Sequence, residues 1–429
     1  MLPDEVSHES GNATCGNKRE RLFAQIYDRF QIRISFRGRT MDKRIYDYWA
    51  ATLQDGYIGD LVGIVERAGS AEELYHMPTE AMKSRLGLSE RLAGYISDNR
   101  PDTDLLAADY DRLSVKGINY VNHCDDDFPD KLRNITSPPY GIFVKGSLPD
   151  PLTPSVAIVG SRECTEYGRL MAEYFGTRLA REGVQIISGM AWGIDGLSQG
   201  AAIAAGGRSY AVMGCGVDIA YPAKNMILYS KLCANGNGVI SEYAPGASAE
   251  ARKFPPRNRI ISALCDVLIV VEARARSGTL ITVDMAIDQG RTVMVVPGRL
   301  TDSLSVGCLN LLYQGALPAT SIESVMEQLD LRSRSKESAP HINSAQKDHP
   351  RRTRAAKHME TISVSTREIP EELAKVYDIL TIEPQSTEAI ANAAALPLST
   401  AMVILTKLEI EGAAKEVWPG YFIRKLELA

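Results

Sequence analysis

Six short apolar segments, separated by amphipathic stretches, constrain the fold of this chain more than any other feature. They lie between residues 155 and 298 and read SVAIVG, VQIISG, SYAVMG, GVISE, DVLIVVEA and TVMVVPG. Near-continuous Val and Ile runs of this length are typical of strands that are covered on both faces, so the sequence predicts an α/β fold with a mostly parallel sheet. Almost every run ends in Gly or a small polar residue. Because ligands of such sheets bind beyond the carboxyl ends of the strands, we expect the functional site there.

The rest of the chain differs from this region in pattern. Apolar residues recur at helical spacing in segments 45–54, 58–68, 79–86 and 90–97, which predicts a small N-terminal helical domain of the SAM or helix-hairpin kind. Near the C-terminus, three helical patterns precede a hairpin that turns at Pro419–Gly420, the layout of a winged helix. We therefore expect five parts: an extension that is disordered or precedes a true start at Met41 (1–41), the helical domain (42–114), the sheet domain (115–328), a disordered linker (329–369) and the winged helix (370–429).

Overall composition indicates no global attraction to a polyanion or a membrane. The chain has 48 Lys and Arg against 53 Asp and Glu, a net charge of −5. Its seven cysteines form no C-x-x-C pair, which favours reduced thiols in the cytoplasm over a disulfide framework or a zinc site. No apolar run approaches ~20 residues, so we expect no transmembrane helix and no membrane partner.

One basic cluster stands out against this acidic background. Residues 252–279 carry six Lys or Arg and only two acids, Asp266 and Glu272. Its first part, KFPPRNR, predicts a basic, Pro-rich loop with one aromatic residue. Cations interleaved with an aromatic ring suit an anionic polymer with stackable faces, which describes single-stranded nucleic acid. The residues expected to contact it are Lys253, Phe254, Arg257, Asn258 and Arg259.

Two alternatives remain open within this cluster. Phe254 could anchor the core or present a face on which a base stacks. Arg257 and Arg259 alternate in sequence, so one is expected to point to the ligand while the other could pair with an acid.

Other strand-end loops add candidate anion sites. Gly160, Ser161 and Arg162 follow the first apolar run, where exposed N–H groups and a guanidinium favour phosphate. Gly189 and Gly193 follow the second run, and Asp195 is expected to cap the next helix. Ser277, Gly278 and Thr279 open a helix after the fifth run. Each loop alone is a weak signal, and convergence of several at one sheet edge would strengthen it.

The chain lacks the residues that several classes of enzyme need for catalysis. Residues 155–328 contain no histidine, which excludes a Ser-His-Asp or Cys-His mechanism and a His-ligated metal within them. No Walker A lysine motif is present. Four acids near the loops could still serve acid–base catalysis: Glu163, Asp195, Glu242 and Glu272. We expect no catalytic residues, cofactor or metal.

The loops, taken in order, resemble the DNA-processing protein A (DprA/Smf) family. The resemblance runs through VGSRECTEYG, SGMAWGIDGLSQGAAIAAG, AVMGCGVDIAYP, FPPRNRIISAL and VVEARARSGTLIT, and covers roughly residues 42–328. Many members read G-I-D-x-x-A-H, where this chain has Ser198–Gln199, so any role of an imidazole there is lost.

The resemblance implies a Rossmann-like protein that binds single-stranded DNA, protects incoming strands during natural transformation, and helps load the RecA recombinase. It also implies a homodimer that pairs through the Rossmann-like domain. On this basis Arg162, Lys253, Phe254, Arg257 and Arg259 would line the DNA pocket.

Two competing functions follow from the same sequence. One is a nucleotide or nucleoside-phosphate hydrolase on a related sheet, but such enzymes resemble P-G-G-x-G-T-x-x-E, and the corresponding turn here reads ARSGTLIT. The other is a protein-interaction adaptor. The candidate third helix of the winged helix carries Lys407 but also Glu409 and Glu411, which favours protein over duplex DNA as the partner of that module.

Overall fold

The computed structural model describes residues 43–56, 58–234, 236–337, 371–381 and 384–425. The extension predicted at residues 1–41 lies outside them. The N-terminal part is helical, as the sequence predicts. Its helices are α2 (Arg44–Thr52), η1 (Leu53–Gly56), α3 (Leu61–Ala68), α4 (Ala71–His76), α5 (Thr79–Leu86), α6 (Glu90–Asp98) and α7 (Thr103–Val115).

Capping and burial explain these helices. Side chains of Asp60, Ser70, Ser89 and Asp102 accept hydrogen bonds from the first free backbone N–H groups of α3, α4, α6 and α7. The helices pack around fully buried residues such as Trp49.

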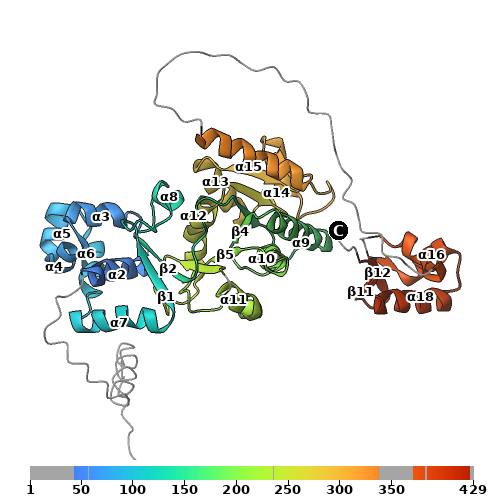
Figure 1. The fold of residues 1–429 in the computed structure, drawn as a ribbon, viewed down its shortest axis with the longest axis horizontal. Coiled ribbons are helices and arrows are strands. Elements are labelled where there is room, and N and C mark those ends of the chain that lie inside the picture. The colour runs from blue at the N-terminus through green and yellow to red at the C-terminus, as the bar shows by residue number, and fades with distance from the viewer. Residues whose placement is uncertain (1–42, 57, 235, 338–370, 382–383, 426–429) are drawn as a thin grey trace, which may run out of the picture. The chain divides into compact units, whose positions relative to one another are not determined.

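A nine-stranded mixed sheet forms the centre of the chain (Figure 1), in the order β1-β2-β6-β5-β4-β3-β7-β8-β9. The seven strands from β6 to β9 in this order are parallel, while β2 pairs antiparallel with both β1 and β6. The strands are β1 (Ile118–Asn122), β2 (Gly141–Gly146), β3 (Ser155–Val159), β4 (Gln185–Ser188), β5 (Ser209–Val212), β6 (Gly238–Ser241), β7 (Val267–Val270), β8 (Thr292–Val295) and β9 (Leu317–Pro318).

The strand order reverses between β3 and β7, because the chain moves outward from β3 through β4, β5 and β6 and then returns to pair β7 on the other side of β3. A point of reversal of this kind leaves the loops after two adjacent strands splayed apart, which is where ligands of open α/β sheets bind. The predicted mostly parallel sheet is therefore confirmed.

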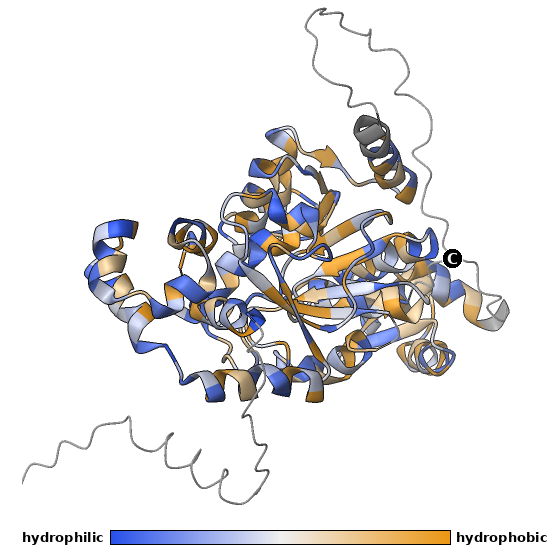
Figure 2. Cartoon of the chain, turned by 60° about the vertical axis from the view of Figure 1, so that its left-hand side comes forward, coloured by the Kyte–Doolittle hydropathy of each residue, from blue (hydrophilic) through white to orange (hydrophobic). Residues whose placement is uncertain are grey.

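Helices cover both faces of the sheet. Strand side chains alternate between two hydrophobic clusters, and Figure 2 shows the resulting apolar strands. One face packs against α9 (Glu166–Arg181), α10 (Ile194–Ala204) and α15 (Ile322–Glu337). The other packs against α12 (Phe254–Leu264), α13 (Gly278–Asp288) and α14 (Val306–Tyr313). Shorter connections are α8 (Asp130–Arg133), η2 (Ala223–Asn225), α11 (Met226–Leu232) and η3 (Ala251–Lys253).

Residues 371–425 form a separate hydrophobic core. They comprise α16 (Glu371–Ile379), β10 (Gln385–Ser386), α17 (Thr387–Ala394), α18 (Leu398–Ile410), β11 (Ala414–Trp418) and β12 (Tyr421–Arg424). The strands pair in the order β10-β12-β11, and Gly420 takes a positive φ of 78° at the hairpin turn predicted there. The three helices and the hairpin expected from the sequence are present.

Two further observations concern the ends of this arrangement. Helix α15 continues to Glu337, past the expected start of the linker at residue 329, and residues 338–370 lie outside the described part of the chain.

Among the described residues, no one helix has the length and apolarity to cross a membrane; α17 and α18, bent by 106°, meet the criterion only as a pair.

Candidate nucleic-acid interface

Three strand-end loops touch one another at the carboxyl edge of the sheet. The backbone N–H of Ile194, after β4, donates to the carbonyl of Ser161, after β3, at 3.2 Å. The Thr279 hydroxyl, at the start of α13, donates to the carbonyl of Gly160 at 3.3 Å. Gly193 has φ +83°, and a Cβ on it would lie 2.4 Å from the Ser161 carbonyl oxygen, so only glycine fits there. The structure thus brings together the loops that the sequence singles out.

Helix α12 begins where the sequence predicts a loop. Pro255 and Pro256 occupy the first turn, where no backbone N–H needs an intrahelical acceptor, so the two prolines start the helix rather than prevent it. The expectation of a basic, Pro-rich loop is wrong for this reason. Helical geometry separates Arg257 from Arg259 by about 200° around the axis, so their side chains leave the helix in different directions.

An aromatic cluster lies at the start of α12. The half-buried ring of Phe254 stacks on Tyr221, with ring centroids 5.5 Å apart and an interplanar angle of 25°. The guanidinium carbons of Arg162 and Arg257 lie 5.7 Å and 5.8 Å from the Phe254 centroid. Gly214 gives the ring room, since a Cβ there would lie 2.8 Å from Phe254 Cδ1. Phe254 is therefore neither fully buried nor isolated.

Arg257 is buried and connects two strand ends. Its guanidinium donates to the carbonyl of Val212, at the end of β5, and lies against Gly189, at the end of β4. Burial lowers the pKa of Arg257 to about 10, an effect that the nearby carboxylate of Asp195 opposes. Burial likewise raises the pKa of Asp195. The buried Arg257 side chain therefore holds together the loops that follow β4 and β5.

Asp195 does not cap α10, contrary to expectation. Gly193 holds the N-cap position, and Asp195 lies in the first turn, where its carboxylate accepts a hydrogen bond from Gly189 N–H at 3.1 Å. The carboxylate folds back toward the preceding loop because the buried Arg257 guanidinium is there.

Arg259 and Lys253 also have internal partners. Arg259 Nη2 lies 2.5 Å from Glu242 Oε2, and the Glu242 side chain is only 1% exposed. Lys253 Nζ lies 2.5 Å from Asp55 Oδ1 in η1 and 3.1 Å from Glu250 Oε1, so it connects the helical domain to the sheet domain. Asn258 is half-buried.

The exposed cations of the region are fewer than the sequence suggests. Arg162 is exposed and contacts the Phe254 ring. Arg252 pairs with Glu250 at 2.8 Å, Arg274 lies 3.8 Å from Glu163, and Arg276 is exposed. Arg162 is thus the predicted site residue best placed to meet a phosphate.

The start of α13 keeps an open backbone face at the point where the strand order reverses. Ser277 caps the helix by accepting from Thr279 N–H at 3.1 Å. A Cβ on Gly278 would meet no atom within 4 Å, so a ligand can approach the backbone there. Glu272, at the end of β7, accepts from Thr165 N–H at 3.0 Å and from its hydroxyl at 2.5 Å, and burial raises its pKa.

Residues 119–330 match the family model described as DNA recombination-mediator protein A. DNA processing protein DprA of Streptococcus pneumoniae is 42% identical over 206 residues, which cover 48% of this chain and 72% of that protein. The chain belongs to the DprA/Smf family. Protein Smf of Escherichia coli K12 is 33% identical over 297 residues, covering 69% of this chain and 75% of Smf. The X-ray structure of S. pneumoniae DprA superposes with a TM-score of 0.58 at 32% identity, covering 66% of this chain and 97% of that one. The Rossmann-like fold predicted for the sheet domain is confirmed.

Gln199 has a structural role at the position where many DprA/Smf members carry histidine. It is fully buried, accepts from Met190 N–H at 3.0 Å, and donates to Ser209 Oγ at 3.2 Å and Tyr210 O at 3.0 Å. Met190 has a positive φ of 51°, which costs energy in a non-glycine residue. Gln199 therefore fixes the loop after β4 with a side chain that does not titrate.

Sequence reasoning missed three exposed residues of this edge: Trp192, Tyr221 and Lys224. Trp192 belongs to the loop after β4, and Lys224 lies in η2. The sequence signal that could have identified them is the presence of aromatic and basic residues within strand-end loops.

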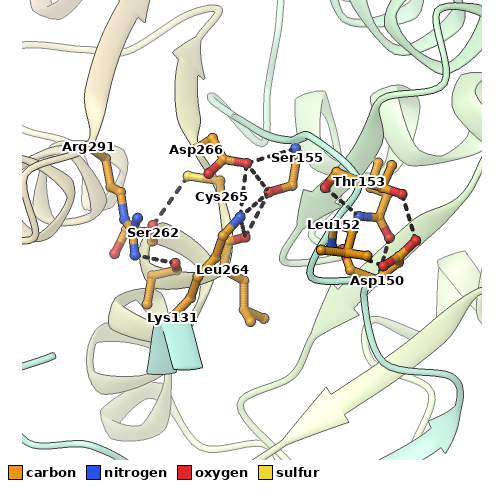
Figure 3. Close-up of polar contacts among 12 residues, drawn as sticks. Lys131, Asp150, Leu152, Thr153, Ser155, Ser262, Leu264, Cys265, Asp266 and Arg291 are labelled. Atoms are coloured by element: carbon orange, nitrogen blue, oxygen red, sulfur yellow. Dashed lines mark hydrogen bonds and ion pairs between the residues drawn. The ribbon is translucent and has the colours of Figure 1, made fainter. Parts of the chain in front are cut away.

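A large cleft lies at the opposite edge of the sheet, but the negative charge of its lining makes it a poor site for DNA. Its volume is about 1680 Å³, and it is lined by six aspartates but only three cations, Arg44, Lys131 and Arg291. In Figure 3, Asp266 accepts from Lys131 Nζ at 2.9 Å and from Ser155 N–H at 3.1 Å. The carboxylates would repel a phosphate backbone, so size alone does not identify the interface.

Among the described residues, no group of three or more His, Cys, Asp or Glu is arranged to hold a metal ion.

Internal pairing predicts that two arginine substitutions differ strongly in their effect on the free energy of unfolding. Arg259→Ala leaves Glu242 buried without its cation and should lower the free energy of unfolding by about 3–5 kcal/mol. Arg162→Ala removes an exposed side chain and should change it by less than about 0.5 kcal/mol. Urea unfolding measures both. Adding Glu242→Gln to Arg259→Ala should recover part of the loss. An Arg259→Ala variant as stable as the parent would show that the ion pair is not structural.

Proposed function

We propose that this protein binds single-stranded DNA at the carboxyl edge of its sheet and acts in DNA processing during transformation or recombination. The observation that carries this proposal is the contact among the loops after β3, β4 and β7 at the reversal of strand order, with Arg162 exposed over the ring of Phe254. A phosphate donor beside a stackable ring suits a strand whose bases are unpaired. The family description, DNA recombination-mediator protein A, supports the same function.

The predicted site residues divide into two groups under this proposal. Those that face the strand are Gly160, Ser161, Arg162, Phe254, Asn258, Ser277, Gly278 and Thr279. Those that shape and hold the surface are Gly189, Gly193, Lys253, Arg257 and Arg259, because they are buried or paired within the protein.

We propose binding without catalysis. Three of the four acids that could serve a hydrolase are buried and already engaged: Asp195 with Gly189 N–H, Glu242 with Arg259, and Glu272 with Thr165. Carboxylates held in this way are poorly placed to activate water.

The binding mode gives a direct test. Fluorescence anisotropy should show tighter binding to oligo-dT than to a blunt duplex of equal length, with affinity that falls steeply as salt rises. Arg162→Ala should weaken binding and reduce the slope of log K against log salt by about one, because one phosphate contact is lost. Phe254→Ala should weaken binding at an unchanged slope. Equal or tighter binding to duplex contradicts the proposal.

We propose further that the strand is handed to a RecA-type recombinase in the cytoplasm. The mediator function of the family supports this step. Purified protein should stimulate RecA filament formation on oligo-dT coated with single-strand-binding protein, and Arg162→Ala should reduce the stimulation. If the parent protein and Arg162→Ala stimulate RecA filament formation equally, transfer of the strand to RecA does not depend on this surface.

The proposed homodimer has a suitable face around β8. Helices α13 and α14 and strand β9 all contact β8. They expose large apolar side chains: Ile281, Ile287, Tyr313 (94% exposed) and Leu317. Exposed apolar residues on elements that adjoin a short edge strand favour a protein contact.

Charge at this face should disrupt the dimer. Tyr313→Glu or Ile287→Glu should convert a dimer to a monomer in light scattering coupled to size exclusion, since burying a carboxylate costs more than the contact provides. Leu152→Glu, which alters an equally exposed residue outside this face, is the control and should remain dimeric. A parent protein that is monomeric at micromolar concentration would contradict the proposal.

We propose that residues 371–425 are a winged helix that contacts protein rather than duplex DNA. The exposed residues of α18 include four large apolar side chains, Leu398, Met402, Val403 and Ile410, and only one cation, Lys407, where a helix for the major groove would be basic.

Removing this module should leave strand binding largely intact. Within the part of the chain that the structure describes, its core at residues 373–422 shares no hydrophobic cluster with residues 43–337, so deletion of residues 338–429 should leave a folded protein. Affinity for oligo-dT should fall by less than tenfold, because every proposed strand contact lies outside the deletion. A loss as large as that of Arg162→Ala would show that the module supplies DNA contacts.

A further inference from the structure

Trp192 is an exposed indole on a firmly held loop. It is 51% exposed, whereas Trp49 is fully buried. Its loop is held on both sides. Asn225 Nδ2 donates to the carbonyls of Met190 at 2.9 Å and Ala191 at 3.2 Å, and Ile194 N–H donates to the carbonyl of Ser161 at 3.2 Å. Leaving so much indole in water is unfavourable, and the loop has little freedom to fold the ring inward. An exposed aromatic ring on a fixed loop therefore indicates a binding site.

A cation lies over one face of this ring. Lys224 Nζ is 5.3 Å from the Trp192 ring centroid, and Lys224 is itself exposed. A ring face with an adjacent ammonium group matches a nucleotide, whose base stacks while its phosphate pairs with the cation.

The pair is continuous with the interface already described. Gly193, next to Trp192, packs on the carbonyl oxygens of Ser161 and Arg162. On the other side, Tyr221 stacks on Phe254 and is followed within three residues by Lys224. Trp192 thus lies between the Arg162 loop and η2, the segment that follows Tyr221 in the chain.

We propose that Trp192 and Lys224 form a second stacking subsite for single-stranded DNA, next to the one at Phe254. One base stacks on the indole, and Lys224 contacts an adjacent phosphate. The proposal rests on the proposed single-strand binding and extends it by naming the direction of the strand, from Phe254 past Trp192 toward α11.

Tryptophan fluorescence tests this placement. The chain has three tryptophans, and Trp49 is buried, so in a Trp418→Phe protein the change on adding ligand reports Trp192. Oligo-dT should quench this fluorescence with the same midpoint as an anisotropy titration. An abasic strand with the same number of phosphates should bind more weakly and should not quench.

Substitutions separate stacking from charge. Trp192→Ala should weaken binding to oligo-dT roughly 5- to 150-fold at unchanged salt slope, and Trp192→Phe should retain most of the affinity. Lys224→Ala should reduce the salt slope by about one. Leu152→Ala alters an exposed apolar residue before β3, away from the proposed path of the strand; it is the matched control and should bind as the parent does.

Two results would overturn the proposal, and they differ. Absence of oligo-dT binding by the parent protein at low salt overturns both the proposed function and this subsite. Normal binding that neither quenches Trp192 nor changes in Trp192→Ala overturns the subsite alone, and loss of dimerisation in Trp192→Ala would then assign the ring to a protein contact.

Discussion

The buried guanidinium of Arg257 is the contact on which the carboxyl edge of this sheet depends. It touches the ends of β4 and β5 and faces the carboxylate of Asp195, which in turn holds the loop after β4. Because a buried cation is costly without partners, these groups must stay together once the core forms. Helix α12 is thereby fixed over the strand ends, and Phe254, one turn earlier, is fixed with it. The position of the exposed Arg162 side chain, which contacts that ring, follows from the same arrangement.

This arrangement changes how the basic cluster should be interpreted. Lys253, Arg257 and Arg259 each have an internal acidic neighbour, so they build the surface and contribute little free charge to it. The surface offered to a ligand is instead formed by exposed backbone, by Arg162 and by aromatic rings. Fewer free cations and more rings favour a strand with accessible bases over a duplex that presents only phosphates.

The sequence predicts the fold well for a clear physical reason. Strands buried on both faces must be apolar at nearly every position, so β3 to β8 are visible as Val- and Ile-rich runs, and their strand-end glycines mark the edge where loops meet. The sequence predicts a loop at the start of α12 because consecutive prolines such as Pro255–Pro256 are common in loops, but proline is equally acceptable in the first turn of a helix.

The partners of the buried cations could not be predicted, because they lie far away in the sequence. Asp55 is about 200 residues from Lys253, and Asp195 is about 60 from Arg257. Nothing local distinguishes a paired arginine from a free one, and for the same reason the exposure of Trp192 was not foreseen. Gln199 was identified as a departure from the family pattern, but its hydrogen bonds to Met190 and Tyr210 required the structure.

Amide hydrogen exchange with and without saturating oligo-dT tests directly whether DNA binds at the carboxyl edge of the sheet. We expect added protection in residues 160–165, 189–193 and 277–280, with no change in residues 123–131 and 146–150 around the aspartate-lined cleft. Protection confined to that cleft, or to residues 371–425, would contradict binding at the carboxyl edge.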